Sequence, residues 1–166
     1  MKALILLLML LSFKADAYDL SISEIRKLFQ KSALEKESCS KLISLLQPFN
    51  ETNNPSVAGY KACATMMMAR HVFNPLSKWL NFTDGRNLLE RCIQADSQST
   101  ELRFLRFAIQ TKTPSFLGYN NSIDQDKRFL IAMVRSLADE HLRTIIISFL
   151  KNSLHLSHSE KQTLQS

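Results

Sequence analysis

Residues 101–110, ELRFLRFAIQ, carry the pattern that decides the fold of this chain. At about 100° per residue, the side chains of Arg103, Arg106 and Gln110 fall on one narrow polar stripe of a helix. Apolar side chains surround this stripe on both sides, namely Leu102, Phe104, Leu105, Phe107, Ala108 and Ile109. A helix that is apolar over most of its circumference must be covered by other elements, so this segment is predicted to lie at the centre of a helical domain.

The two arginines of this helix need partners, because an unpaired charge in a protein interior costs several kcal/mol. Glu90, Asp124 and Asp126 are the candidate carboxylates by their position in the chain. If the stripe instead faces a concave surface, Arg103 and Arg106 could grip a carboxylate or a phosphate through bidentate hydrogen bonds. The sequence leaves both interpretations open and favours internal ion pairs.

Signals for further helices lie on both sides of this segment. In a capping box, a serine hydroxyl accepts a backbone N–H and the side chain three residues later returns the hydrogen bond. Capping boxes are predicted for Ser21 with Glu24, Ser122 with Gln125 and Ser157 with Glu160. Apolar spacing predicts helices over residues 55–71, 85–95, 101–112 and 140–152. Pro75 is predicted to interrupt the helical pattern before residue 85.

The predicted fold class is all-α, a single domain of antiparallel helix pairs in an α-α superhelical bundle. Small residues after Pro55, such as Gly59 and Ala62, let neighbouring helices approach closely, and Trp79 and Phe82 supply aromatic bulk. The chain contains only three glycines and four prolines, which argues against a turn-rich β fold.

One segment resembles part of a known helical repeat. Gly85, Leu89, Cys92, Asp96 and Ser97 are similar in type and spacing to the second helix of a tetratricopeptide repeat. Cys92 stands where alanine is usual, and Ser97 stands where proline is usual. The resemblance implies a tetratricopeptide-like middle segment and does not extend to a recurring array.

A longer resemblance begins with the block at residues 101–110. It continues through Pro114, residues 116–119 and 126–127, and includes residues 60–61 and 73–75. Together these segments resemble a family of uncharacterised exported helical proteins from bacteria. The resemblance implies an all-helical fold and a location in the bacterial cell envelope, and it brings no reaction with it.

Residues 1–17 have the pattern of a secretory signal peptide. Lys2 precedes an apolar run over residues 3–11, and Ala15 and Ala17 have the small-residue spacing of a cleavage site. The run is too short to cross a bilayer of roughly 30 Å, which needs about 20 apolar residues. We therefore expect cleavage after Ala17, a single helical domain over residues 18–166, and export to the periplasm or the extracellular space. The residue directly after the cleavage site is Tyr18 and not a cysteine, so a lipid anchor is not predicted.

Charge and cysteine content restrict the partners of the protein. The formal net charge is +6, but the basic residues are scattered along the chain and form no run, so nucleic acid is not an expected partner. The cysteines, Cys39, Cys63 and Cys92, are odd in number and contain no Cys-x-x-Cys pair. They predict no disulfide framework; three buried thiols are favoured, and a single bridge is the alternative.

No pattern in the chain predicts catalysis, a cofactor or a metal. There is no glycine-rich phosphate loop and no Gly-x-Ser-x-Gly turn around a nucleophilic serine. His155 and His158 lie three residues apart but lack a third metal ligand close by.

Three functions remain open at this point. The predicted one is an exported, non-enzymatic interaction domain, an adaptor that presents a groove to a peptide or protein of the cell envelope. This groove is predicted to be lined by Arg103, Arg106, Gln110, Tyr119 and Lys127. The second is a structural or assembly component of the envelope, in which the polar stripe is a buried network and the outer surface works by packing. The third is an enzyme whose acids and bases come from distant segments.

Overall fold

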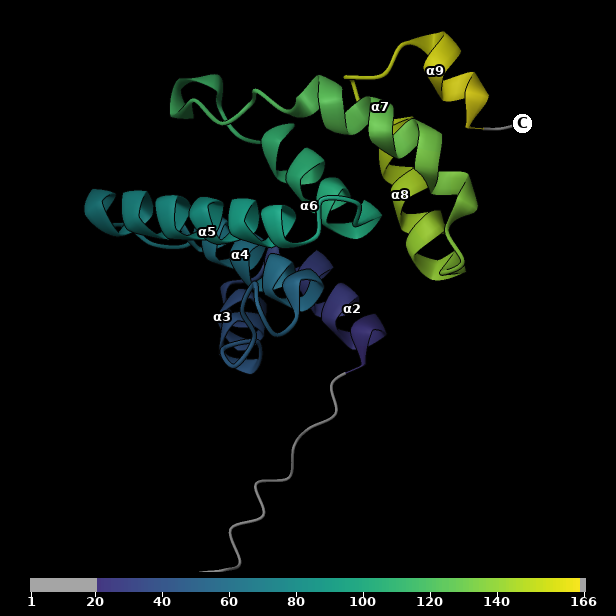
Figure 1. Cartoon of the computed structure of the whole chain (residues 1–166). Helices are drawn as coiled ribbons and strands as arrows, with labels where there is room; N and C mark the ends of the chain where they lie inside the picture. The colour runs from purple at the N-terminus through teal and green to yellow at the C-terminus, as the bar shows by residue number, and fades with distance from the viewer. Residues whose placement is uncertain (1–20, 165–166) are drawn as a thin grey trace, which may run out of the picture.

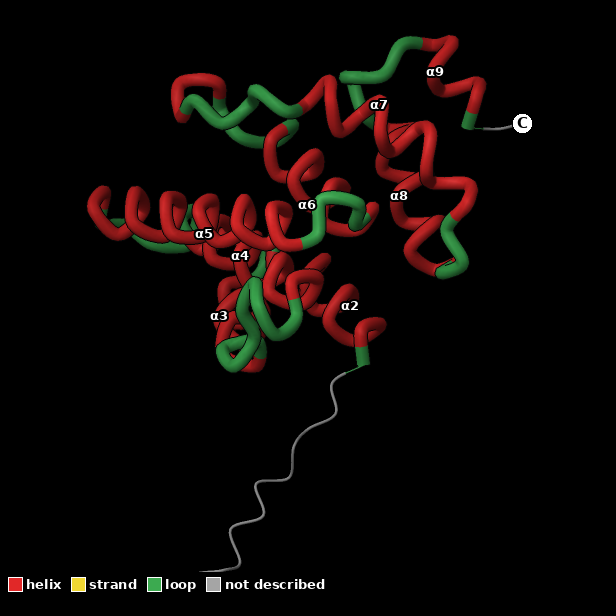
Figure 2. The backbone as a smooth tube through the Cα atoms, viewed as in Figure 1, coloured by secondary structure: helices red, strands yellow, loops and turns green. Residues whose placement is uncertain are grey.

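The computed structural model describes residues 21–164, and every regular element in that range is helical (Figures 1 and 2). The α-helices are α2 (Ile22–Ser32), α3 (Lys36–Leu45), α4 (Pro55–Met68), α5 (Pro75–Ala95), α6 (Thr100–Gln110), α7 (Ile123–Met133), α8 (Glu140–Asn152) and α9 (His158–Thr163). Two short 3-10 helices, η2 (Ser115–Leu117) and η3 (Val134–Ser136), complete the set. The predicted all-α class is confirmed, and the predicted signal peptide at residues 1–17 lies outside the described residues.

Side-chain caps explain several of the helix starts. The capping boxes of Ser21 with Glu24 and of Ser157 with Glu160 are both formed. The capping box predicted for Ser122 is wrong, because the Ser122 side chain makes no cap hydrogen bond. Its backbone N–H instead donates to Oε1 of Gln110 at 3.2 Å, so a buried side chain of α6 holds the start of α7.

Helix α5 is longer than the sequence analysis predicts. It begins at Pro75, where the Asn74 side chain accepts hydrogen bonds from the backbone N–H groups of Leu76 and Ser77. The helical pattern is interrupted before Pro75, as predicted, but the predicted start of the next helix at Gly85 is wrong. A proline in the first helical turn loses no hydrogen bond and its fixed φ suits the helix, so α5 begins at Pro75. Gly85, predicted as a helix start, lies in the middle of α5.

Close packing against α4 explains why a glycine, Gly85, stands in the middle of α5. A Cβ atom at this position would lie 2.5 Å from the carbonyl oxygen of Ala62 and 2.8 Å from the backbone nitrogen of Met66. Gly59 of α4 lies closest to Leu102 and Leu105 of α6, and a Cβ atom there would also lie 3.8 Å from the side chain of Leu89 of α5. Residue numbers thus rise along α4 as they fall along α5, so the two helices pack antiparallel. The small residues do allow close approach, as predicted.

Helix α6 is shared by two hydrophobic cores. Leu102 and Leu105 pack into a core formed with α2, α3, α4 and α5. Phe104 and Phe107 pack into a second core with α7 and α8, where both rings meet Phe149 edge to face. Figure 1 shows α6 between these two groups of helices. The predicted central position of this helix is confirmed.

Of the remaining predictions about buried residues, those for the cysteines and Phe82 are confirmed and that for Trp79 is not. Cys39, Cys63 and Cys92 are buried free thiols, and burial raises the pKa of Cys39 to about 11, so the favoured interpretation of the cysteines is confirmed. Phe82 is buried, whereas Trp79 is more than half exposed and contributes little to the core. Among residues 21–164, no helix combines the length and apolar character that a bilayer span requires.

The close contact at Gly85 generates a stability prediction. Replacement Gly85→Ala should lower the free energy of unfolding by about 1–3 kcal/mol, because the new methyl group meets backbone atoms that cannot rotate away. Urea denaturation followed by circular dichroism measures the change. Asn87→Ala, at an exposed position of the same helix, controls for helix propensity and should cause no loss. A Gly85→Ala variant as stable as the parent would contradict the packing argument.

Candidate functional site

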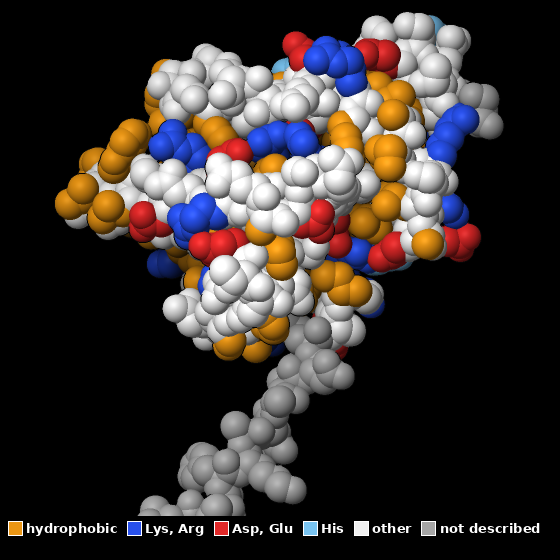
Figure 3. Space-filling model, in the orientation of Figure 1, with side chains coloured by type: hydrophobic (Ala, Val, Ile, Leu, Met, Phe, Trp, Pro, Cys, Tyr) orange, Lys and Arg blue, Asp and Glu red, His pale blue; other side chains and the backbone are white. Residues whose placement is uncertain are grey.

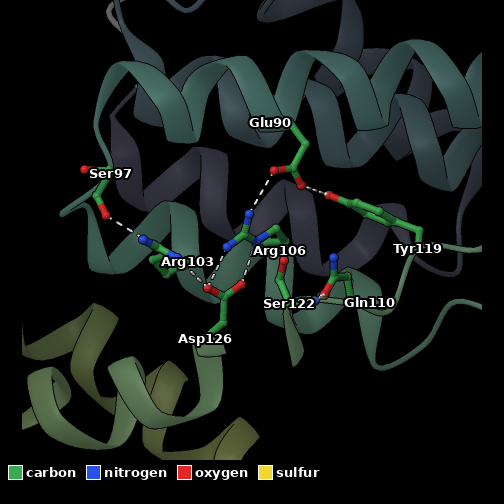
Figure 4. Close-up of polar contacts among 8 residues, drawn as sticks. All are labelled: Glu90, Ser97, Arg103, Arg106, Gln110, Tyr119, Ser122 and Asp126. Carbon is green, nitrogen blue, oxygen red and sulfur yellow. Dashed lines mark hydrogen bonds and ion pairs between the residues drawn. The ribbon is translucent and has the colours of Figure 1, made fainter. Parts of the chain in front are cut away.

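The polar stripe of α6 forms a buried ion-pair network with α5 and α7 (Figure 4). Arg106 binds the carboxylate of Asp126 through two hydrogen bonds, from Nε to Oδ2 at 2.6 Å and from Nη2 to Oδ1 at 2.8 Å. Its remaining Nη1 donates to Oε2 of Glu90 at 2.8 Å. Asp126 is fully buried, so its negative charge depends on these partners.

Arg103 adds a second cation to the same carboxylate. Its Nη1 donates to Oδ1 of Asp126 at 3.0 Å, and its Nε donates to the backbone carbonyl of Ser97 at 3.1 Å. The guanidinium also lies over the ring of Phe129, 5.2 Å from the ring centroid. These contacts come from α7 and from the turn before α6, and they leave the side chain only 12 % exposed.

Tyr119 and Gln110 extend the network toward the loop before α7. The Tyr119 hydroxyl donates to Oε1 of Glu90 at 2.6 Å, and burial together with this carboxylate raises the pKa of Tyr119 well above its usual value. Gln110 accepts from the Ser122 backbone through Oε1, while its buried Nε2 has no hydrogen-bond partner in the structure. The loop is therefore held through side chains of α5 and α6.

Charge in the network is balanced, which limits its chemistry. The two guanidinium groups face two carboxylates, and although burial alone would lower the pKa of Arg106, Asp126 and Glu90 outweigh it and raise that pKa. Every carboxylate oxygen of Asp126 and Glu90 already accepts a hydrogen bond from within the protein. Neither group is free to act as a general base, so the arrangement is suited to holding helices together.

The structure brings four of the five predicted groove residues together. Arg103, Arg106 and Tyr119 bond the carboxylates of Glu90 and Asp126, which are two of the three predicted partners. Gln110 lies beside this network and bonds the Ser122 backbone. The third candidate, Asp124, instead lies 3.6 Å from Nζ of Lys127.

Lys127 is the predicted groove residue that the structure places elsewhere. Its Nζ lies 3.2 Å from Oε1 of Glu160 in α9 and donates to the backbone carbonyl of His155. Lys127 therefore connects α7 to the C-terminal segment and does not join the α6 network. The four clustered residues are mostly enclosed, so they do not line an open groove in this structure.

A small pocket lies at the edge of the network. Its volume is about 280 Å³, and its lining residues are Arg86, Glu90, Gly118, Tyr119, Asn121 and Ser122. Gly118 has a φ of 61°, a left-handed conformation that glycine adopts without strain. The pocket lies beside Glu90 and Tyr119 of the network, and Tyr119 itself is buried.

A second buried network around Arg26 escaped the sequence analysis. Arg26 in α2 donates from Nε to Oε1 of Glu101 and from Nη1 to Oδ2 of Asp139, both at 2.8 Å. The Tyr60 hydroxyl donates to the same Glu101 oxygen at 2.6 Å. A sequence signal exists, because Arg26 follows Ile22 by four residues and so lies at the edge of the apolar face of its helix, where a charge needs partners once that face is buried.

The other feature that sequence analysis missed is an exposed apolar cluster at the start of α5. We call it the α5 tip and define it by Phe73, Leu76, Trp79 and Leu80, which are 97 %, 64 %, 55 % and 49 % exposed. Met66 of α4 lies opposite Gly85, and α4 ends at Met68, so the first turns of α5 extend beyond α4. Figure 3 shows apolar side chains gathered at this projecting end, at the left of the molecule.

Comparison with protein-family models, with curated proteins and with solved structures finds no match for this chain. In residues 21–164, no group of three or more histidine, cysteine, aspartate or glutamate side chains is placed to hold a metal ion. The interpretation of the site therefore depends on the geometry described above.

The buried network generates a prediction with a matched surface control. Arg106→Met keeps the length of the side chain but leaves Asp126 short of its main partner, and should lower the free energy of unfolding by about 3–5 kcal/mol. Arg91→Met removes the exposed Arg91–Glu51 ion pair and should change the free energy of unfolding by less than about 1 kcal/mol. Chemical denaturation of both variants measures the difference, and equal small effects would contradict a structural role for the network.

The two buried tyrosines predict a loss of stability at alkaline pH. Burial and a neighbouring carboxylate raise the folded-state pKa of Tyr60 and of Tyr119, whereas an unfolded tyrosine titrates near about pH 10. Below that pH neither group makes stability depend on pH. Above it, the unfolded state binds fewer protons, so each tyrosine should lower the free energy of unfolding by about 1.4 kcal/mol per pH unit.

Denaturation curves across the alkaline range test this slope. Tyr119→Phe cannot lose a phenolic proton, so this variant should show a shallower decline than the parent above about pH 10. An unchanged slope in the variant would show that the Tyr119 hydroxyl is not protected as described.

Proposed function

We propose that this chain is an exported, non-enzymatic structural or assembly component of the cell envelope. In this proposal it works by packing the α5 tip against another envelope component. One observation carries the proposal: large apolar side chains are exposed on a projecting helix end, while the polar stripe of α6 is engaged inside the domain.

The exposure of the α5 tip has no explanation in the folding of the domain itself. Single exposed apolar side chains are normal on protein surfaces, but contiguous clusters mark contact sites. The four side chains of the tip fall between residues 73 and 80, and the aromatic ones add large contact areas. A partner that covers them would remove this apolar surface from water.

The adaptor with an arginine-lined groove has less support from this geometry. It requires Arg103 and Arg106 to be available to a peptide, yet internal acceptors engage both guanidinium groups and the side chain of Arg106 is 7 % exposed. A carboxylate ligand would first have to displace Asp126 from Arg106.

Two further parts of the proposal rest on sequence resemblance. Export depends on the signal-peptide pattern at residues 1–17 and on the resemblance to exported helical proteins of bacteria. The tetratricopeptide-like arrangement is supported by the antiparallel packing of α4 on α5, with close approach at Gly85. Stacked helix pairs of this kind create extended surfaces suited to contacts with other macromolecules.

Fractionation of a bacterial host that exports the protein tests the proposal. The parent protein should be recovered with the envelope fraction, and the double variant Leu76→Ser/Trp79→Ser should move to the soluble fraction, because it lacks most of the apolar contact. Leu154→Ser is the matched control, since Leu154 is 98 % exposed and lies outside the tip. Retention of the double variant in the envelope fraction would overturn the proposal.

A further inference from the structure

We infer that the pocket between α5 and the loop before α7 binds a ligand through one carboxylate group, which the guanidinium of Arg86 holds. The residues that line this pocket are Arg86, Glu90, Gly118, Tyr119, Asn121 and Ser122. None of them belongs to the α5 tip, so the inference goes beyond the proposed function and does not depend on it.

Arg86 brings an unpaired positive charge to the pocket. The residue is half-buried, and its guanidinium makes no hydrogen bond or ion pair with residues 21–164. Glu90 follows it by four residues and lies on the same side of α5. Both oxygens of Glu90 already accept hydrogen bonds, one from Arg106 and one from Tyr119, so Arg86 gains no partner from its own helix.

The charges around the pocket leave this one cation in excess. Arg103 and Arg106 are balanced by Asp126 and Glu90 in the buried network. The only other carboxylate near the start of α7, that of Asp124, faces Lys127 on the same helix. Arg86 therefore adds a net charge of +1, which a ligand with a single negative charge neutralises.

The uncharged groups at the pocket offer further hydrogen-bond donors. Within residues 21–164, the Asn121 amide and the Ser122 hydroxyl make no hydrogen bond, and Ser122 does not cap α7. The amide of Gln110, which bonds the Ser122 backbone through Oε1, keeps a buried Nε2 without a partner, directed toward Tyr119 in Figure 4. A pocket with free donors, whose single carboxylate is engaged, is suited to an acceptor-rich anion.

The size and charge of the pocket favour a carboxylate among the anions. Its volume of about 280 Å³ lies just below the range of about 300–1,000 Å³ that holds drug-sized ligands, so the bound group is small. A planar carboxylate carries one charge and matches two parallel N–H groups of the Arg86 guanidinium. A phosphate monoester carries about 1.5–2 negative charges at pH 7, and its excess charge would lie close to Glu90 without a cation.

Titration of protein labelled with ¹⁵N-glycine tests the inference. The chain contains three glycines, and Gly59 and Gly85 are buried in helix contacts, so the amide signal of Gly118 is the one that reports the pocket. The variant Gly118→Asn identifies this signal by its loss, because asparagine tolerates a positive φ.

Two acids serve as probes, since a small free acid and the C-terminus of a peptide share the carboxylate group. They are N-acetylglycine and acetyl-trialanine, and each is compared with its own C-terminal amide, which has the same shape without the charge. The expected result is a saturable shift of the Gly118 signal with an acid, with a Kd on the order of 1 mM, and none with either amide. Binding of N-acetylglycine alone supports a small free acid as ligand, and tighter binding of acetyl-trialanine supports a peptide C-terminus.

Two variants separate Arg86 from the general charge of α5. Arg86→Gln should weaken binding of the acid at least about tenfold, because the charged hydrogen bonds are lost. Lys78→Gln removes one positive charge from an exposed position of the same helix outside the pocket and should bind like the parent. Circular dichroism checks that both variants are folded, and the comparison of acid with amide uses the parent protein, so it does not depend on them.

Four outcomes would overturn the inference. They are equal shifts with an acid and its amide, unchanged binding in Arg86→Gln, no Gly118 shift with either acid, and tighter binding of inorganic phosphate than of both acids. None of these results bears on the fractionation of Leu76→Ser/Trp79→Ser, so the inference and the proposed function can fail separately.

Discussion

The burial of one carboxylate, that of Asp126, constrains the arrangement of the whole middle of this protein. Removing this charge from water costs several kcal/mol unless its oxygens are fully engaged. Arg106 grips both oxygens, and Arg103 donates to one of them. Because the spare N–H groups of Arg106 also need an acceptor, Glu90 must lie within reach. Helices α5, α6 and α7 are thereby held in one relative position that a purely apolar interface would specify less strictly.

Helix α6 transmits this constraint to the rest of the chain. Its leucines complete the core of the N-terminal helices and its phenylalanines complete the core of the C-terminal helices. At its first turn, Glu101 accepts hydrogen bonds from Arg26 and Tyr60, and Arg26 also reaches Asp139 before α8. The interior is therefore occupied by structural contacts, whereas the α5 tip, through which we propose that the protein acts, lies on the outer surface.

Much of the candidate site could be predicted from the sequence, for a local reason. Arg103, Arg106 and Gln110 share a helix face because of the 3.6-residue period, and buried arginines require carboxylates such as Glu90 and Asp126. Lys127 could not be placed, because its direction depends on how α9 returns against α7. The start of α5 could not be predicted, because a glycine such as Gly85 suits both a helix boundary and a close contact between helices. Only the position of the neighbouring helix α4 shows that Gly85 makes a close contact and that the helix begins at Pro75.

The sequence by itself determined the helical class and the central place of α6, because helical periodicity is a local property of the chain. It limited the partners of the two arginines to three carboxylates, and the packing of α5 and α7 against α6 selected Glu90 and Asp126. Tertiary structure decided which side chains became accessible. Trp79 and Phe82 lie three residues apart with similar apolar character, yet Phe82 is buried and Trp79 is exposed. Trp79 is exposed because α4 ends before it can cover the first turns of α5. The sequence of those turns does not show where the neighbouring helix ends.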